Sequence, residues 1–341
     1  MKKTIYFHVG TVKTGSTLIQ KILWENKELL EEFNFHYFNL IEPKLALPRY
    51  GNAEFLLDKS ITMTNDEIER YIDNQKADNI IISEEGLWAN MDLLIKDIFS
   101  KYDKKIILYV RKPADVIAAW ASENAEPYNA LQKEHASGIG VVPIEEGVEE
   151  FTQRYIKIFE NFFKNLERLK NTEVVIRAYD REQFENNDIF RDFLNILKIN
   201  TNKFLEDSKC VVTKIANVSR TRKFCDISTM VFELLYKRGM KKKYSLKLVS
   251  YVYENCSSGD DRAVLETLDD RTILDIKNRL QWIEEYIEEH YLEKKVLFKN
   301  SSPTFFLSGQ KRLVYQPLNS TEVEGLMEKY LIENIDDKYI N

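Results

Sequence analysis

The sequence is poor in cysteine, glycine and proline, and it contains no long apolar run. Its three cysteines lie far apart, with no C-x-x-C pair and no paired histidines near them, which excludes a disulfide framework and a cysteine-based metal site. Eleven glycines and seven prolines, with no low-complexity tract, are typical of a globular chain. No stretch of about 18 apolar residues occurs, so no transmembrane helix is expected.

Basic residues do not outnumber acidic ones. With 49 Lys and Arg against 55 Asp and Glu, the formal net charge is −6. General nucleic-acid-binding proteins carry a strong basic excess, so no nucleic-acid partner is expected. The amino terminus runs straight into an apolar segment that Gly10 and Lys13 interrupt, which is unlike the core of a signal peptide. These features predict a cytoplasmic protein.

Short apolar runs alternate with helical patterns over the first 200 residues. The runs typical of buried strands are Thr4–Val9, Ile80–Ile82, Lys104–Arg111 and Glu173–Tyr179. Strands separated by helices predict an α/β fold, in which helices flank a parallel sheet. Ligands are expected at the carboxyl ends of its strands. Residues 125–147 are expected to be irregular and Glu149–Lys170 to form an amphipathic helix. Beyond residue 200 the pattern becomes helical.

The first strand leads into a loop that is suited to binding an anion. Residues 10–17 read GTVKTGST, and an apolar pattern with helical spacing follows them. A loop of small residues that opens a helix directs the backbone N–H groups of Thr14 to Thr17 at one point, with the helix dipole behind them. Lys13 adds a full positive charge. The alternative is an ordinary strand-to-helix turn whose lysine faces water.

The order of residues in this loop indicates which anion it binds. A Walker A loop places lysine directly after its second glycine, whereas Lys13 here precedes Gly15 by two residues. Preceded by His8 and Val9, the loop instead resembles the phosphosulfate loop of sulfotransferases that use 3′-phosphoadenosine 5′-phosphosulfate (PAPS), in its bacterial, carbohydrate-type form. The resemblance implies a P-loop-like three-layer core, and in motif order it covers roughly residues 4 to 220.

A second match concerns the catalytic base. The stretch from Ser83 to Gly86 resembles the Ser-x-Glu that ends the second strand in many sulfotransferases of this type, which implies that Glu85 is the base. Glu84 is then a solvated or structural neighbour. His8 is a second candidate for the base, although a histidine within a strand is also typical of a packed, hydrogen-bonded core.

A third match concerns the 3′-phosphate of the nucleotide. Arg111 begins an Arg-x-Pro-x-Asp stretch, and the resemblance implies a bidentate contact between this arginine and the phosphate. The family places a serine eight residues after the arginine, where this chain has Ala119. Ser122 lies one helical turn further along the same face and is the candidate replacement. The alternative is that Arg111 is a structural ion-pair residue.

Later stretches match more weakly. Residues 177–180, 192–194 and 217–219 follow the order of a strand, a short helix and an Asn-x-Ser segment that is seen late in bacterial sulfotransferases. The basic run Arg220, Arg222 and Lys223 has two interpretations: it closes over the nucleotide or an anionic acceptor, or it forms a solvated face. The basic cluster at residues 237–243 is a candidate surface for an anionic glycan or lipid head group.

Taken as a whole, the resemblance implies a sulfotransferase without a metal. Glu85 deprotonates an acceptor hydroxyl, on a carbohydrate or glycoconjugate, and Lys13 stabilises the leaving adenosine 3′,5′-bisphosphate. The residues expected to hold PAPS are Lys13, Thr14, Gly15, Ser16, Thr17, Arg111 and Ser122. Residues 1–220 form the expected core. Residues 221–341 form a helical region, packed on the same domain, that supplies an acceptor wall or lid.

Two other functions stay open at this point. One is a kinase of a small molecule or nucleoside with related topology, which needs magnesium and a triphosphate; the position of Lys13 argues against it. The other is a non-catalytic nucleotide-binding protein with a sulfotransferase fold, which Ala119 makes conceivable. The sequence names neither the acceptor nor the oligomeric state.

Overall fold

A computed structural model describes residues 2–38, 51–57, 63–95, 97–125, 143–209, 220–238, 245–293, 295–299 and 315–334. The chain forms two compact units. The first, here the sheet unit, comprises Met1–Lys112, Tyr155–Ala216 and Trp282–Ser301. The second, here the helical unit, comprises Pro113–Arg154, Asn217–Gln281 and Ser302–Asn341. Residues after the expected boundary at 220 therefore contribute to both units, whereas the sequence pattern suggests a single division of the chain.

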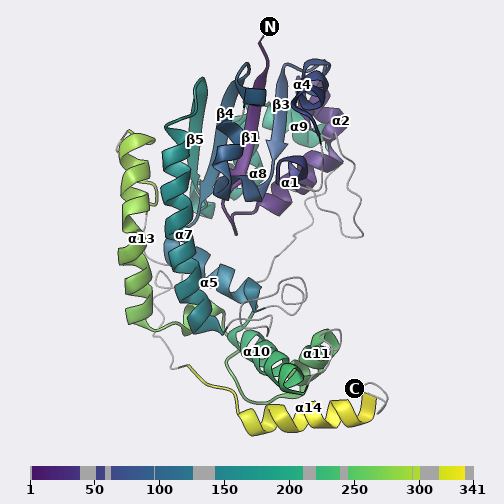
Figure 1. The fold of residues 1–341 in the computed structure, drawn as a ribbon, viewed down its shortest axis with the longest axis vertical. Helices are drawn as coiled ribbons and strands as arrows, with labels where there is room; N and C mark the ends of the chain where they lie inside the picture. The colour runs from purple at the N-terminus through teal and green to yellow at the C-terminus, as the bar shows by residue number, and fades with distance from the viewer. Residues whose placement is uncertain are drawn as a thin grey trace. The chain divides into compact units, whose positions relative to one another are not determined.

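The sheet unit is built on a five-stranded parallel sheet of order β2-β3-β1-β4-β5, of which Figure 1 shows β3, β1, β4 and β5 side by side. The strands are β1 (Thr4–Gly10), β2 (Phe35–Tyr37), β3 (Asn79–Ser83), β4 (Asp103–Val110) and β5 (Thr172–Ala178). The predicted fold class, a parallel sheet flanked by helices with a helical C-terminal part, is confirmed. Strand β2 was not predicted. It has only three residues, and it forms by pairing with β3.

Helices and apolar side chains cover both faces of this sheet. On one face lie α1 (Ser16–Glu25), α2 (Lys27–Glu32), α8 (Ile189–Ile196) and α9 (Thr201–Asp207), which share one apolar core. On the other face Phe7 of β1 packs edge-on against Phe99. Neighbouring residues of β1 therefore face opposite cores, as the alternation of a strand requires. Burial on both faces explains the continuous apolar run of β4.

The helical unit contains the C-terminal helices. Its elements are α5 (Pro113–Asn124), α10 (Arg222–Lys237), α11 (Ser245–Asn255), α12 (Val264–Thr267) and α14 (Ser320–Asn334). Helices α10, α11 and α14 pack around a shared core that includes Val231, Leu248 and Met327. Two long helices, α7 (Ile144–Leu166) and α13 (Asp270–His290), contribute residues to both units.

Helix α7 begins earlier than the sequence predicts. It starts at Ile144, with Glu145 and Glu146 in its first turn, where acidic side chains favour a helix. Residues 144–147, which were expected to be irregular, are therefore helical despite Gly147. Residues 126–142 of the expected irregular segment lie outside the described residues.

The remaining elements are short. They are α3 (Glu54–Leu57), α4 (Asn65–Asp73), η1 (Glu85–Ala89), η2 (Met91–Ile95), η3 (Asp97–Phe99), η4 (Arg181–Gln183) and η5 (Glu185–Asn187). Helix α4 opens with a capping box between Thr64 and Glu67, which satisfies two backbone N–H groups reciprocally. In the part of the chain that the structure describes, no helix is both long and apolar enough to cross a membrane.

Candidate functional site

The three sequence motifs lie at the carboxyl ends of three adjacent strands. The loop of residues 10–17 follows β1, Glu85 follows β3, and Arg111 follows β4. In a parallel sheet these ends lie at the same edge, which is where such folds bind ligands. The fold therefore gathers segments that are about 25 to 100 residues apart in sequence.

Hydrogen bonds fix the start of the loop to the sheet. The N–H of Thr11 donates to the carbonyl oxygen of Tyr109 on β4 at 3.0 Å, and the Thr14 hydroxyl donates to the carbonyl oxygen of Thr11 at 2.7 Å. Thr11 and Thr14 are buried. The Thr14 hydroxyl is thus part of the loop's own framework, while its backbone remains part of the predicted anion site.

The loop then turns into α1 through two residues with left-handed backbone. Lys13 has φ 60° and Gly15 has φ 73°. Gly15 is the N-cap of α1, and a Cβ there would lie 3.2 Å from Ile189 Cδ1 and 3.3 Å from Tyr179 Cε2. Glycine is thus required for its conformation and for its close neighbours.

The first intrahelical hydrogen bonds of α1 start at Leu18, whose N–H donates to the Gly15 carbonyl at 3.0 Å. The N–H groups of Ser16 and Thr17 precede it and have no partner within the helix. These N–H groups lie at the positive end of the helix dipole, where the sequence predicts that an anion binds, and anion binding there stays a prediction. Ser16 is buried and Thr17 is exposed, so the two hydroxyls have different surroundings.

Glu85 lies directly against this loop. The Ser16 hydroxyl donates a hydrogen bond to Glu85 Oε2. Gly10, with φ 109°, packs against the same residue, and a Cβ on Gly10 would lie 3.4 Å from Glu85 Cγ. Glu85 is half-buried, so its carboxylate is held beside the loop and is still partly accessible.

Glu84 has a different environment, although it is the next residue in the chain. Its backbone N–H donates to the His8 carbonyl at 3.0 Å, and its carboxylate lies against Gly51. Burial and the negative charge of Glu84 raise the pKa of Tyr37 well above its usual value. The Glu85 carboxylate thus accepts the hydrogen bond from Ser16, while the Glu84 carboxylate lies beside Gly51.

His8 belongs to the apolar core on the α1 and α8 face. It is 1% exposed, its Nδ1 lies 2.8 Å from the Ser83 hydroxyl, and its ring packs edge-on against Phe193. Burial lowers the pKa of His8 to about 3, so its imidazole is neutral at neutral pH. These are the surroundings of a packed core histidine, which was the alternative to a catalytic role.

Arg111 contacts the loop from the β4 side. Its Nη1 donates to the Lys13 carbonyl at 3.3 Å, and its guanidinium carbon lies 5.7 Å from the centre of the Tyr179 ring. The next residue, Lys112, is buried and pairs with Asp180 at 3.7 Å. In this pair of basic residues it is Lys112 that makes the structural ion pair.

Ser122 belongs to the helical unit and is 4% exposed. Its hydroxyl donates to the Ala119 carbonyl one turn earlier in α5, at 2.9 Å. Arg111 belongs to the sheet unit. A shared role of Arg111 and Ser122 in holding the 3′-phosphate stays a prediction.

Tyr179, to which the sequence motifs assign no individual role, packs against both Gly15 and Arg111. Its position directly after β5 was the available signal, because that strand ends at the same edge of the sheet. Asp192 accepts a hydrogen bond from the Tyr109 hydroxyl at 2.8 Å and is structural in this setting. The Asn-x-Ser segment at 217–219 lies outside the described residues, as do residues 239–243 of the basic cluster.

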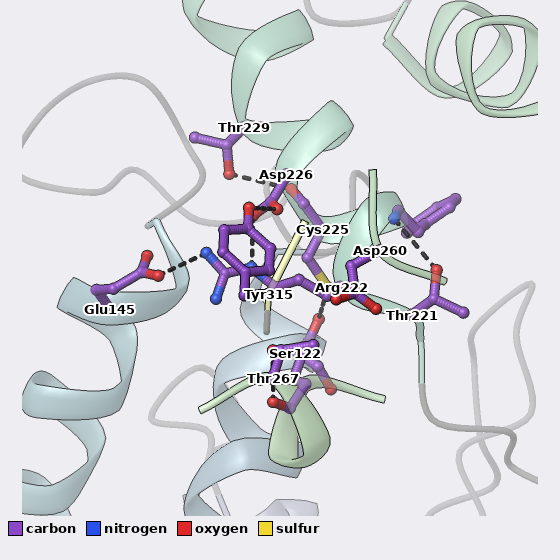
Figure 2. A network of polar contacts seen from close by, with 12 residues as sticks. Ser122, Glu145, Thr221, Arg222, Cys225, Asp226, Thr229, Asp260, Thr267 and Tyr315 are labelled. Atoms are coloured by element: carbon purple, nitrogen blue, oxygen red, sulfur yellow. Dashed lines mark hydrogen bonds and ion pairs between the residues drawn. The ribbon is translucent and has the colours of Figure 1, made fainter. Parts of the chain in front are cut away.

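The basic run after residue 219 is not a solvated face. Arg220 is exposed, but Arg222 and Lys223 are only 5% and 7% exposed. The Arg222 guanidinium donates to Glu145 at 2.6 Å and to Asp226 at 2.8 Å, and the hydroxyl of Tyr315 donates to the same Asp226 at 2.6 Å (Figure 2). The solvated interpretation is therefore wrong for Arg222 and Lys223, because partners within the helical unit bury both.

A cavity of about 610 Å³ lies in the helical unit, along the first turns of α7 and α13. Glu149, Asp275 and Arg279 line it, and the guanidinium of Arg279 pairs with both carboxylates. None of the predicted site residues lines this cavity.

Comparison with protein-family models and with curated protein sequences gave no match.

Proposed function

We propose that this protein is a sulfotransferase that moves the sulfuryl group of PAPS to an acceptor hydroxyl. The observation that carries the proposal is that two hydrogen bonds connect the three motifs: Ser16 to Glu85, and Arg111 to the Lys13 carbonyl. Sulfuryl transfer requires an anion-binding loop, a cation at the leaving oxygen, a base and a second phosphate site. These segments provide a candidate for each.

The loop is proposed to bind the 5′-phosphosulfate. The backbone N–H groups at the start of α1 face the anion, and Lys13 stabilises the negative charge that grows on the leaving phosphate. In this step the acceptor oxygen forms a bond to sulfur while the bond from sulfur to the 5′-phosphate oxygen breaks. The products are a sulfate ester and adenosine 3′,5′-bisphosphate.

Glu85 is proposed to accept the proton of the attacking hydroxyl. Its hydrogen bond to Ser16 places the carboxylate next to the loop where the sulfuryl group binds. A base must lie within hydrogen-bond reach of the proton that it removes, and the position of Glu85 meets this requirement for an acceptor that approaches the loop. Glu84, which lies against Gly51, has no such role.

Arg111 is proposed to bind the 3′-phosphate with its guanidinium group. Its contact with the Lys13 carbonyl fixes the side chain beside the loop, and the planar guanidinium suits bidentate binding of a phosphate. We propose a carbohydrate or glycoconjugate as the acceptor, because the loop resembles that of carbohydrate-type sulfotransferases. The mechanism requires no metal.

The proposal is tested by thermal unfolding with adenosine 3′,5′-bisphosphate, adenosine 5′-phosphate, or ATP with magnesium. A ligand at 100 times its dissociation constant adds about 2.7 kcal/mol to the free energy of unfolding, which is a readily measured shift. We expect the bisphosphate to stabilise the protein far more than the monophosphate does. A shift with ATP and magnesium alone would instead favour a kinase.

A pair of arginine variants makes the test specific to the 3′-phosphate. In Arg111→Ala the bisphosphate should lose its advantage over the monophosphate. Arg181→Ala removes an exposed arginine of the same unit and should keep the wild-type response. If the bisphosphate does not stabilise the wild-type protein at all, the sulfotransferase proposal is wrong.

A further inference from the structure

The Ser16 hydroxyl lies where it can donate a hydrogen bond either to the Glu85 carboxylate or to an anion bound at the start of α1. Its hydroxyl donates to Glu85 Oε2, and its backbone N–H lies at the start of α1, where an anion would bind. The side chain is 3% exposed, so its hydroxyl depends on protein or ligand partners rather than on bulk water. A serine hydroxyl has a single proton to donate. It therefore donates to Glu85 or to a bound anion, but not to both.

We propose that Ser16 couples nucleotide binding to the release of Glu85. Without nucleotide, the Ser16 hydroxyl holds one oxygen of the carboxylate. When the 5′-phosphosulfate binds at the start of α1, the hydroxyl turns to the anion, and Oε2 loses the hydrogen bond from Ser16. This inference rests on the proposed function, and it makes Ser16 a positioning residue for Glu85 and the nucleotide the first substrate to bind.

The exchange also makes Glu85 a better base. Loss of a hydrogen-bond donor and the arrival of a neighbouring negative charge both favour the protonated form of a carboxylate. The proton affinity of Glu85 is then highest when the sulfuryl donor is in place, which is when a base is needed. Before nucleotide binds, the Ser16 hydroxyl donates to this carboxylate and lowers its proton affinity.

The other hydroxyls of the loop do not share this position. The Thr14 hydroxyl donates to the Thr11 carbonyl at 2.7 Å, within the loop itself. Thr17 is exposed, and it follows Ser16 in the first turn of α1. Thr17→Ala is therefore a matched comparison for Ser16→Ala, because each variant removes one hydroxyl from the same turn and only Ser16→Ala removes the hydrogen bond to Glu85.

The experiment measures the proton affinity of Glu85 by carbon-13 NMR. The full-length protein is labelled at the glutamate carboxyl carbon, and the Glu85 signal is assigned by its absence in Glu85→Gln. Its titration midpoint is recorded for the wild type, Ser16→Ala and Thr17→Ala, without and with saturating adenosine 3′,5′-bisphosphate. Charged residues on the neighbouring segments, which are Lys13, Glu84 and Arg111, are the same in all three proteins.

We expect nucleotide to raise the wild-type midpoint by about one pH unit, a tenfold gain in proton affinity, since a hydrogen bond to a charged group is lost. In Ser16→Ala the midpoint should already be raised without nucleotide and should move less when nucleotide binds. Without nucleotide, the Glu85 midpoint of Thr17→Ala should equal that of the wild type, because this variant keeps the hydrogen bond from Ser16 to Glu85.

The outcomes separate this inference from the proposed function. If the bisphosphate binds, as other signals in the same spectra report, but the Glu85 midpoint stays constant or falls, the coupling is wrong while the nucleotide site stands. The same conclusion follows if Ser16→Ala and Thr17→Ala have equal midpoints without nucleotide. If the bisphosphate binds neither wild type nor variant, both proposals are wrong.

Discussion

Two residues of the same type can have different surroundings in this protein even when they are adjacent in the chain. Glu84 and Glu85 are adjacent carboxylates, yet one lies against Gly51 and the other accepts a hydrogen bond from Ser16. The difference arises because the chain changes from strand β3 to the 3-10 helix η1 at this point, so successive side chains leave in different directions. A motif match singled out Glu85, and only the structure shows what its carboxylate contacts.

His8 shows the energetic effect of burial on one titratable group. In the folded protein burial lowers its pKa to about 3, whereas the ordinary value in an unfolded chain is 6.5. Below pH 6.5 the unfolded chain binds a proton that the folded protein does not bind, so stability falls as the pH falls from 6.5 towards 3. Between pH 7.5 and pH 5, His8 should therefore remove about 2 kcal/mol from the free energy of unfolding.

The measurement is urea unfolding of the wild type and His8→Asn at both pH values. Asparagine keeps a polar atom near the Ser83 hydroxyl but does not titrate, so the variant should lose about 2 kcal/mol less than the wild type when the pH is lowered. His290→Asn, at an exposed position, is the matched control and should keep the wild-type loss. Equal losses in His8→Asn and the wild type would show that the core does not hold His8 neutral.

At the scale of elements, local signals located the helices and strands better than they located the contacts between them. Helix α7 starts earlier than predicted because acidic residues favour its first turn. Strand β2 was not predicted because three residues carry almost no periodic signal. Arg222 and Lys223 look like surface charges in the sequence. They are buried because α10 begins where partners from other elements surround its first turn.

Variants of Arg222 and Tyr315 measure how much the polar contacts to Asp226 contribute to the free energy of unfolding. Arg222→Met leaves the Asp226 carboxylate, which is mostly buried, without its cation, and the loss of one partner of a buried ion pair costs about 3 kcal/mol or more. Tyr315→Phe removes a single hydrogen bond to the same carboxylate and should cost about 1 kcal/mol. Urea unfolding of both variants measures the two losses.

A third variant separates charge from packing at the same site. In Arg222→Met/Asp226→Leu the buried carboxylate is removed together with its cation, and only the exposed Glu145 loses its contact with Arg222. Much of the stability lost in Arg222→Met should therefore return. The network would not contribute as an ion pair if Arg222→Met lost no more stability than Tyr315→Phe, or if the double variant were the least stable of the three.

For the whole molecule, the important feature is that each unit is assembled from separated stretches of chain. Helices α7 and α13 each contribute residues to both units, so neither unit corresponds to one continuous piece of sequence. Helix formation is cooperative along its length. We therefore expect the two units to unfold in one transition rather than two.

Fluorine-labelled tryptophan side chains allow the unfolding of the two units to be followed separately. Trp24, Trp88 and Trp282 belong to the sheet unit and Trp120 to the helical unit. In fluorine-19 NMR spectra over a urea series, all four native signals should disappear with the same midpoint, and Trp120→Phe assigns the signal of the helical unit. A separate midpoint for Trp120 would show that the units unfold independently.

The sequence alone determined the α/β class, four of the five strands, and the loop, carboxylate and arginine of the candidate site. These features depend on local patterns: apolar runs, turn residues and short motifs, which neighbouring residues largely specify. Only the tertiary structure decided that Ser16 holds Glu85 rather than Glu84, that His8 faces an apolar core, and that Arg222 is buried. Each of these facts depends on segments that are distant in sequence and that the order of strands in the sheet or the packing of helices brings together. Contacts of that kind leave no periodic signal in the chain.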